Sequence, residues 1–321
     1  MNAMTNDSTR NAVSASGLRK TYGKRVVLDA VDLTIGEGEV FALLGPNGAG
    51  KTTIVRILST LIPADAGTAS VMGHDLRREA GAVRAVIGVT GQFSAVDNLL
   101  TGEENLLLIG RLLHLPATQL RARTAQLLEL FDLVGVARRT PATYSGGEKR
   151  RLDIAMTLMG RPRLIFLDEP TTGLDPRSRH TMWQLIRDLV AEGATILLTT
   201  QYLEEADQLA HRIAVLDHGR IVAEGTPEEL KRRIPGAHIQ LRFPDTAALD
   251  AAARLLRDST RDDAELTLRV PNERGIRSLR GVLDRLGDDV ALDDLSLHTP
   301  DLDDVFFALT GGLDQSKEQL P

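Results

Sequence analysis

A glycine-rich segment near the N-terminus has residue types and a spacing that suit a phosphate ligand. It matches the pattern G-x-x-x-x-G-K-[ST] and consists of Gly45, Pro46, Asn47, Gly48, Ala49, Gly50, Lys51 and Thr52, with Thr53 directly behind it. Glycines let successive backbone N–H groups turn toward one anion, and a following helix adds the positive potential of its N-terminus. In this pattern the lysine faces the β- and γ-phosphates of a nucleotide, and the last hydroxyl binds Mg²⁺. The segment therefore predicts a nucleotide site, with a plain glycine-rich turn as the alternative.

Two adjacent carboxylates follow an apolar segment much later in the chain. Leu164–Leu167 is apolar, and Asp168 and Glu169 come directly after it. A strand end beside a phosphate loop is where a carboxylate that holds magnesium belongs, so we expect Asp168 to contact the metal through water. We expect Glu169 to orient or deprotonate the attacking water. Taken alone, the two acids also fit a solvated turn, and it is the phosphate loop that favours the catalytic interpretation.

Hydrophobic patterning predicts the elements that position these two segments. Phe41–Leu44 reads as a strand before the loop, and a helix-spaced apolar pattern follows the loop. Leu164–Leu167 and Thr195–Thr199 read as buried strands joined by a helix with an apolar stripe at Met182–Val190, which implies a parallel sheet with a right-handed crossover. Val26–Ile35 alternates as antiparallel strands do, and residues 97–160 have helical periodicity. The class is therefore α/β.

The two ends of the chain differ from its middle. Residues 1–13 read as a disordered leader, and a break at Ile234–Gly236 separates a C-terminal segment, residues 237–321. That segment alternates strands and helices and predicts a small second α/β domain. Its predicted strands and helices are His238–Phe243, Ala247–Arg257, Ala264–Val270, Glu273–Leu286, Leu292–Leu297 and Leu302–Leu309.

Composition excludes several other classes of protein. The chain has 321 residues, 42% hydrophobic and 26% charged, which fits a folded protein of about two domains. It has no cysteine and seven histidines, so a thiolate or histidine metal site is not expected. Its net charge is −6, with 17 acidic and 10 basic residues after residue 240, which argues against a nucleic-acid partner. The sequence shows no signal peptide and no apolar run of the ~20 residues that span a bilayer, so we expect a cytoplasmic protein that reaches a membrane through a partner.

A third motif, Tyr144–Arg151, contains Ser145, Gly146 and Gly147 and lies between the phosphate loop and the paired acids. In this order the three motifs closely resemble the nucleotide-binding subunits of ATP-binding cassette (ABC) transporters, over roughly residues 14–232. The resemblance implies a P-loop NTPase cassette with a mostly parallel sheet core, an antiparallel β subdomain and a helical subdomain near residues 93–160. It also implies that ATP and Mg²⁺ bind.

The resemblance gives roles to further residues. Tyr22 matches the position at which family members stack an aromatic ring on adenine. Gln92 matches the glutamine that in family members senses the γ-phosphate and Mg²⁺. Asp175 matches an aspartate that touches the opposite subunit, although it could also cap the helix that begins at Pro176. Ser145–Gly147 precedes a helix and therefore forms a second anion site. The family uses it across a head-to-tail homodimer, with each ATP between one phosphate loop and the partner's Ser-Gly-Gly.

Two residues depart from the family pattern. Glu148 replaces a glutamine, which puts a carboxylate where a nucleotide edge is expected. Gln201 replaces the histidine that holds the γ-phosphate, and because glutamine can hydrogen-bond but carries no positive charge, this affects hydrolysis more than binding.

Four further segments resemble one branch of this family, the ATP-binding subunits of daunorubicin/doxorubicin-resistance exporters. They are residues 201–207, 217–220, 223–227 and 302–311. That branch implies an ATPase serving a separate membrane permease, which handles a hydrophobic drug of the anthracycline type. Exporters of lipids or polysaccharides, a non-transport ABC ATPase and a regulator without turnover are the alternatives. For residues 302–310 we expect a role in stabilising the dimer or the permease contact.

Overall fold

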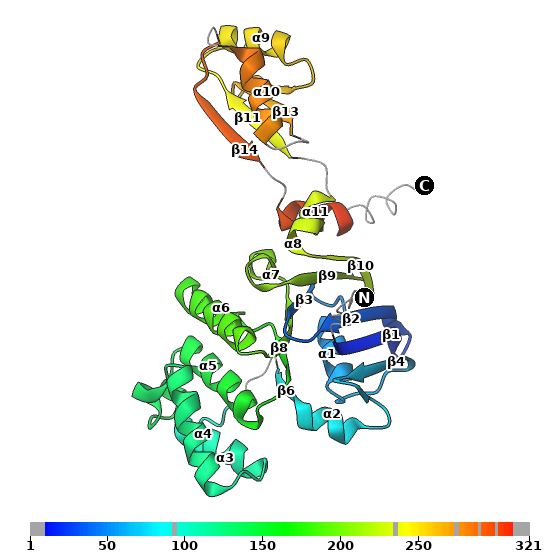
Figure 1. The fold of residues 1–321 in the computed structure, drawn as a ribbon, viewed down its shortest axis with the longest axis vertical. Coiled ribbons are helices and arrows are strands. Elements are labelled where there is room, and N and C mark those ends of the chain that lie inside the picture. Colours follow the sequence, from blue (N-terminus) through cyan, green and yellow to red (C-terminus); the bar gives the residue numbers. More distant parts are fainter. Residues whose placement is uncertain are drawn as a thin grey trace, which may run out of the picture. The chain divides into compact units, whose positions relative to one another are not determined.

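The computed structural model describes residues 10–91, 95–233, 237–272, 276–287, 290–298 and 301–310. The chain divides into two compact units, residues 1–227 and 228–321, and Figure 1 shows the elements of each. The division falls at the start of helix α8 (Pro227–Arg232).

A six-stranded sheet forms the centre of the first unit (Figure 1). Its order is β10-β9-β3-β8-β7-β6, and neighbouring strands run parallel except in the β9–β10 hairpin. Strands β3, β7 and β8 are buried along their whole length, as parallel strands covered on both faces are. The sequence prediction of these central strands is confirmed. Their bounds are β3 (Val40–Leu44), β6 (Ile87–Thr90), β7 (Leu164–Asp168), β8 (Thr195–Thr200), β9 (Arg212–Asp217) and β10 (Arg220–Gly225).

A second, antiparallel sheet of the first unit has the order β2-β1-β4-β5. It contains β1 (Asn11–Tyr22), β2 (Arg25–Gly36), β4 (Ala66–Val71) and β5 (His74–Asp75). Val13 pairs with Ile35 of β2 and with Val71 of β4, and its side chain is buried. The predicted leader is therefore wrong for residues 11–13, because these residues are part of strand β1, where Ala12 and Val13 are buried in the core and Asn11 pairs with Gly36.

The helices of the first unit cover the two sheets and form a separate group. Helix α1 (Lys51–Leu58) contacts both sheets through β2, β4 and β7, while α6 (Pro176–Ala191) packs on α7 (Leu203–Leu209). The stripe predicted on α6 is buried at Met182, Leu185, Ile186 and Leu189. Helices α3 (Gly102–Leu112), α4 (Ala117–Leu130) and α5 (Gly146–Thr157) form the group between β6 and β7, as the periodicity predicts, and α2 (Ala80–Val86) precedes β6.

The second unit has its own sheet, ordered β12-β13-β11-β14 and antiparallel throughout. Its core includes Ile239, Leu241, Phe243, Leu249 and Leu268. Three strands and three helices occur close to the predicted ranges, and the short polar strand β12 was missed because three residues give no pattern. The bounds are β11 (His238–Arg242), α9 (Thr246–Leu255), β12 (Thr260–Asp262), β13 (Thr267–Pro271), α10 (Ile276–Leu286), β14 (Asp294–His298) and α11 (Leu302–Thr310). Across the described residues of both units, every helix is too short or too polar to cross a bilayer.

Candidate nucleotide-binding site

The phosphate loop joins β3 to α1 with a backbone that requires glycine. Gly50, the residue before α1, has φ of 114°, in the left-handed region. A Cβ there would lie 2.7 Å from Leu28 Cδ2, and one on Gly45 would lie 2.2 Å from the Leu216 carbonyl oxygen. Larger residues would push the loop away from the strands that shape it.

Lys51 is held against the loop that precedes it. Its ammonium donates to the carbonyl oxygens of Gly45 (2.7 Å) and Pro46 (3.1 Å), and its Nζ lies 3.9 Å from Glu169 Oε1. Burial lowers the pKa of Lys51, and the negative charges of Glu169 and Asp168 oppose that shift. The result is a fixed cation beside two carboxylates, at the start of a helix whose N-terminus favours an anion.

A pocket of about 390 Å³ opens over this loop. Eight of the predicted site residues line this pocket, together with Arg25 and Val27. The eight are Tyr22, Asn47, Gly48, Gly50, Lys51, Thr52, Thr53 and Glu169. Tyr22 is 48% exposed, so part of its ring is accessible for stacking, and Lys20 Nζ lies 5.6 Å from the centre of that ring. Arg25 and Val27 were missed, although two residues at this spacing on one strand share a face.

The carboxylate of Asp168 is fixed by two hydroxyls. Its Oδ1 accepts hydrogen bonds from Thr199 (2.5 Å) and Thr52 (3.3 Å), and Asp168 is 3% exposed. Carboxylate and hydroxyl oxygens are the ligands that Mg²⁺ prefers, so Asp168 and Thr52 fit that ion. Thr199 was missed, and its signal is positional: it pairs with Asp168 across the parallel strands β7 and β8.

Glu169 leaves the strand in an unusual backbone conformation, with φ of 48°. Its N–H donates to both the carbonyl oxygen and the hydroxyl of Thr199, at 3.1 Å each. Its Oε2 accepts a hydrogen bond from Thr172 (3.2 Å), and Oε1 faces Lys51. A carboxylate is thereby presented to the pocket beside the lysine.

The predicted second anion site caps helix α5. Ser145 Oγ accepts from the Glu148 N–H (3.2 Å), and Glu148 Oε2 accepts from the Ser145 N–H (2.7 Å), which is a reciprocal capping box. This backbone bond lowers the pKa of Glu148. The Glu148 carboxylate, which departs from the family pattern, thus caps the start of its own helix. Ser145, Gly146 and Gly147 do not line the nucleotide pocket.

The remaining predicted residues that the structure describes do not line the pocket. Asp175 caps α6 by accepting from the Ser178 N–H (3.0 Å) and hydroxyl (2.5 Å), and these bonds lower its pKa, so the capping alternative is confirmed. Gln201 directly follows β8 and is half-buried. Gln92 lies outside the described residues. Ala49, Gly45 and Pro46 complete the loop, the last two as acceptors for Lys51.

Comparison with known proteins identifies the family. Residues 28–172 match the family described as ABC transporter. Over 310 residues the chain is 49% identical to "Daunorubicin resistance ATP-binding protein DrrA3" of Streptomyces coeruleorubidus, across 96% of this chain and 98% of that protein. The chain belongs to the ABC transporter family. It is the ATPase subunit of an ABC exporter, as the sequence predicts.

Other ABC proteins match over similar lengths. "Daunorubicin/doxorubicin resistance ATP-binding protein DrrA" of Streptomyces peucetius is 46% identical over 95% of this chain and 94% of its own. "Nod factor export ATP-binding protein I" of Paraburkholderia xenovorans (strain LB400) is 40% identical over 94% and 97%. Among solved structures, an ATP-binding subunit of an ABC transporter matches with TM-score 0.62 at 30% identity, over 69% of this chain and 92% of its own. The dimeric, ADP- and phosphate-bound ABC cassette MJ0796 matches with TM-score 0.61 at 28% identity, over 67% and 98%.

Proposed function

We propose that this ABC ATPase works as a head-to-tail homodimer on the cytoplasmic face of the membrane, bound to a separate permease that exports a hydrophobic drug of the anthracycline type. One observation carries the choice of substrate. Identity to proteins named for daunorubicin or doxorubicin resistance is 46–49%, whereas it is 35–40% to those named for Nod factor export.

In this proposal the pocket and the residues near it supply the groups that ATP hydrolysis needs. Tyr22 stacks on adenine, and residues 45–53 bind the phosphates with the Lys51 ammonium at the β- and γ-groups. Thr52 and Asp168, with Gln92, hold Mg²⁺, which when bound neutralises negative charge on the phosphates.

Two residues act on the reacting atoms. Glu169 orients or deprotonates the water that attacks the γ-phosphorus as the bond to the β,γ-bridging oxygen breaks. Gln201 donates a hydrogen bond to the γ-phosphate in place of the family's histidine. The hydrogen bond from Thr172 and the nearby Lys51 ammonium support this role for Glu169, because both hold its carboxylate beside the phosphate loop.

The separation of Ser145 from the pocket supports the dimer. A capped helix start is an anion site, but in this chain it does not line the pocket that Lys51 lines. We propose that Ser145–Gly147 of one chain contacts the γ-phosphate held by its partner, and that Asp175 meets the partner at the same interface. ATP then holds the two chains together, and hydrolysis releases them. The second unit, through residues 302–310, stabilises this assembly or the permease contact.

An efflux assay tests the export proposal. The chain is co-expressed with the permease proposed as its partner, in cells that lack their own drug pumps, and daunorubicin accumulation is followed by its fluorescence. We expect the pair to lower accumulation, and the pair with Lys51→Ala to leave accumulation at the level of empty cells. A complex that assembles and hydrolyses ATP yet leaves accumulation unchanged would rule out this drug class, and Nod factor would then be the next substrate to test.

A further inference from the structure

Arg150 makes several hydrogen bonds beside the nucleotide pocket, and the proposed function gives this residue no role. It lies in the second turn of α5, the helix capped by Ser145. Its side chain is only 13% exposed. Burial lowers the pKa of Arg150, while the charges of Asp153 and Asp168 oppose that shift. A guanidinium stays charged at every physiological pH, so this is a buried, fixed cation.

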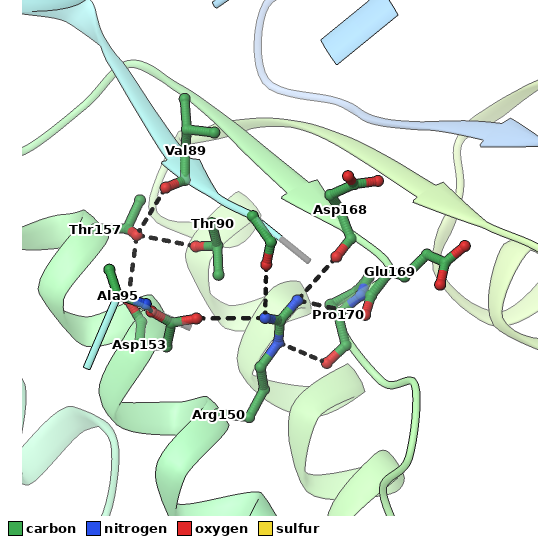
Figure 2. Close-up of polar contacts among 10 residues, drawn as sticks. Val89, Thr90, Ala95, Arg150, Asp153, Thr157, Asp168, Glu169 and Pro170 are labelled. Atoms are coloured by element: carbon green, nitrogen blue, oxygen red, sulfur yellow. Dashed lines mark hydrogen bonds and ion pairs between the residues drawn. The ribbon is translucent and has the colours of Figure 1, made fainter. Parts of the chain in front are cut away.

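All five N–H groups of this guanidinium have an acceptor, as Figure 2 shows. Nε donates to the Pro170 carbonyl (3.0 Å), and Nη2 donates to the carbonyls of Asp168 (3.0 Å) and Glu169 (3.3 Å). Nη1 donates to the Gly91 carbonyl (3.1 Å) and to Asp153 Oδ2 (3.3 Å). Three of these acceptors are consecutive peptide groups at the point where β7 ends.

One of these residues, Glu169, has an unfavourable backbone conformation. Glu169 is a non-glycine residue in the left-handed region, a conformation that persists only where the surroundings impose it. Thr199 binds the Glu169 N–H, and Arg150 binds the Glu169 carbonyl and the carbonyls on both sides. The direction of the Glu169 side chain therefore depends on Arg150.

Helix α5 is itself tied to the chain around β6. Asp153 Oδ1 accepts from the Ala95 N–H (3.1 Å), and the Thr157 hydroxyl lies 2.9 Å from that of Thr90 (Figure 2). Arg150 thus joins this helix to the end of β7. A displacement of α5 would reach the peptide groups of residues 168–170 through one rigid side chain.

We propose that Arg150 is a positioning residue for Glu169: it fixes the peptide groups of residues 168–170 so that the Glu169 carboxylate faces the γ-phosphate, and it makes that position depend on α5. The proposal rests on the catalytic role proposed for Glu169. A planar group with five donors is required, because the three donors of a lysine radiate from one nitrogen and cannot span these acceptors.

Arg150→Lys tests the proposal while keeping the charge. We expect kcat for ATP hydrolysis to fall by about 10–100-fold, the size of effect seen when a catalytic base is misplaced. The dissociation constant for ATP should stay within about twofold, because Arg150 does not line the pocket. Lys149→Gln is the matched control, since Lys149 is the adjacent cation on α5 and its ammonium donates to the Asn98 side chain (2.9 Å) at the surface. Its kcat should be that of the parent chain, and an Arg150→Lys chain that also keeps the parent kcat overturns the proposal.

A double-mutant cycle separates positioning from general structural support. If Arg150 acts through Glu169, adding Arg150→Lys to Glu169→Gln should change the residual hydrolysis rate by less than about twofold. A further loss equal to that of Arg150→Lys alone overturns the proposal. Should Arg150→Lys fail to bind ATP, the same cycle is run with Asp153→Asn, which removes the partner charge of Arg150, and the same two outcomes decide.

The cycle also distinguishes the two proposals from each other. If Glu169→Gln keeps the parent rate, the role proposed for Glu169 fails, and the inference about Arg150 fails with it. If Glu169→Gln is inactive and Arg150→Lys is fully active, only the inference about Arg150 fails.

Discussion

Glu205 is a buried acid whose contribution to the free energy of unfolding should fall as pH rises, the opposite of the usual effect of an acidic side chain. Its side chain lies on α7 and is fully buried. Oε1 accepts hydrogen bonds from the Thr171 hydroxyl (2.7 Å) and the Trp183 indole N–H (3.4 Å). Burial raises the pKa of Glu205, and hydrogen bonds from Thr200, Thr171 and Trp183, together with the Arg179 charge, oppose the rise without cancelling it. The folded chain therefore binds a proton at this position more tightly than the unfolded chain does.

The sign of the pH effect follows from proton counts. Between the unfolded pKa of about 4.3 and the raised folded pKa, the folded state binds more protons than the unfolded state. The free energy of unfolding contributed by Glu205 therefore falls as pH rises through this window, and it is fully present only below it. Glu205→Gln keeps an acceptor for Thr171 and Trp183 and cannot ionise. At pH 8 we expect Glu205→Gln to be as stable as the parent, within about 1 kcal/mol, or more stable.

Truncation should have the opposite effect. Glu205→Ala leaves two buried donors without their acceptor and opens a cavity, which we expect to cost about 2–4 kcal/mol. Urea unfolding at pH 6 and pH 8 measures these differences. The chain contains a single tryptophan, so Trp183 fluorescence reports the first unit alone, with circular dichroism as the second probe.

A nearby acid provides the control for this experiment. Glu204 is mostly exposed and its Oε2 lies 3.5 Å from Arg179 Nη1, so Glu204→Gln should change stability by less than about 0.5 kcal/mol at either pH. If Glu205→Gln proves as unstable as Glu205→Ala at pH 8, the carboxylate is charged in the folded chain and the reasoning is refuted.

Three further substitutions test the packing and the pocket. Gly88→Ala places a Cβ 2.6 Å from Thr157 Cγ2 and should lower the unfolding free energy by about 1–3 kcal/mol in a urea titration; an unchanged midpoint would contradict this packing. Tyr22→Ala should weaken ATP binding by about 5–100-fold in a fluorescence titration while Tyr22→Phe does not, and equal affinities would exclude stacking. Thr199→Val removes the shorter hydrogen bond to Asp168 and should lower the ATPase rate at saturating Mg²⁺; an unchanged rate would show that Asp168 needs no such support.

Much of the fold was predictable because its central strands are continuous apolar runs. Leu164–Asp168 and Thr195–Thr200 are buried at every position, and the motif acids stand at the end of the first of these strands, with Asp168 as its last residue and Glu169 directly after it. The start of β1 was not predictable in the same way, since Asn11 and Ala12 carry no strand signal until Val13 is seen paired in the sheet. Strand order also depends on partners that the chain order does not reveal: β9 lies beside β3.

The site residues, too, were predictable only in part. Residues that bind through their own side chains, such as Lys51 and Thr52, have a motif and were predicted into the pocket that holds them. Arg150 was missed because it binds main-chain carbonyls, and a carbonyl has no sequence signature. Thr199 was missed because its partner depends on the strand register. Glu148 was interpreted from the family pattern as a group at the nucleotide, whereas its own helix cap uses the carboxylate.

The central claim is that the phosphate loop of one chain and Ser145 of its partner bind the same ATP. Sedimentation velocity of the Glu169→Gln chain, with saturating Mg-ATP and then with Mg-ADP, tests it most directly. We predict dimers with ATP, monomers with ADP, and monomers with ATP when Ser145→Arg is added, although that variant still binds nucleotide at its own loop. A Glu169→Gln chain that remains monomeric when saturated with ATP contradicts the account.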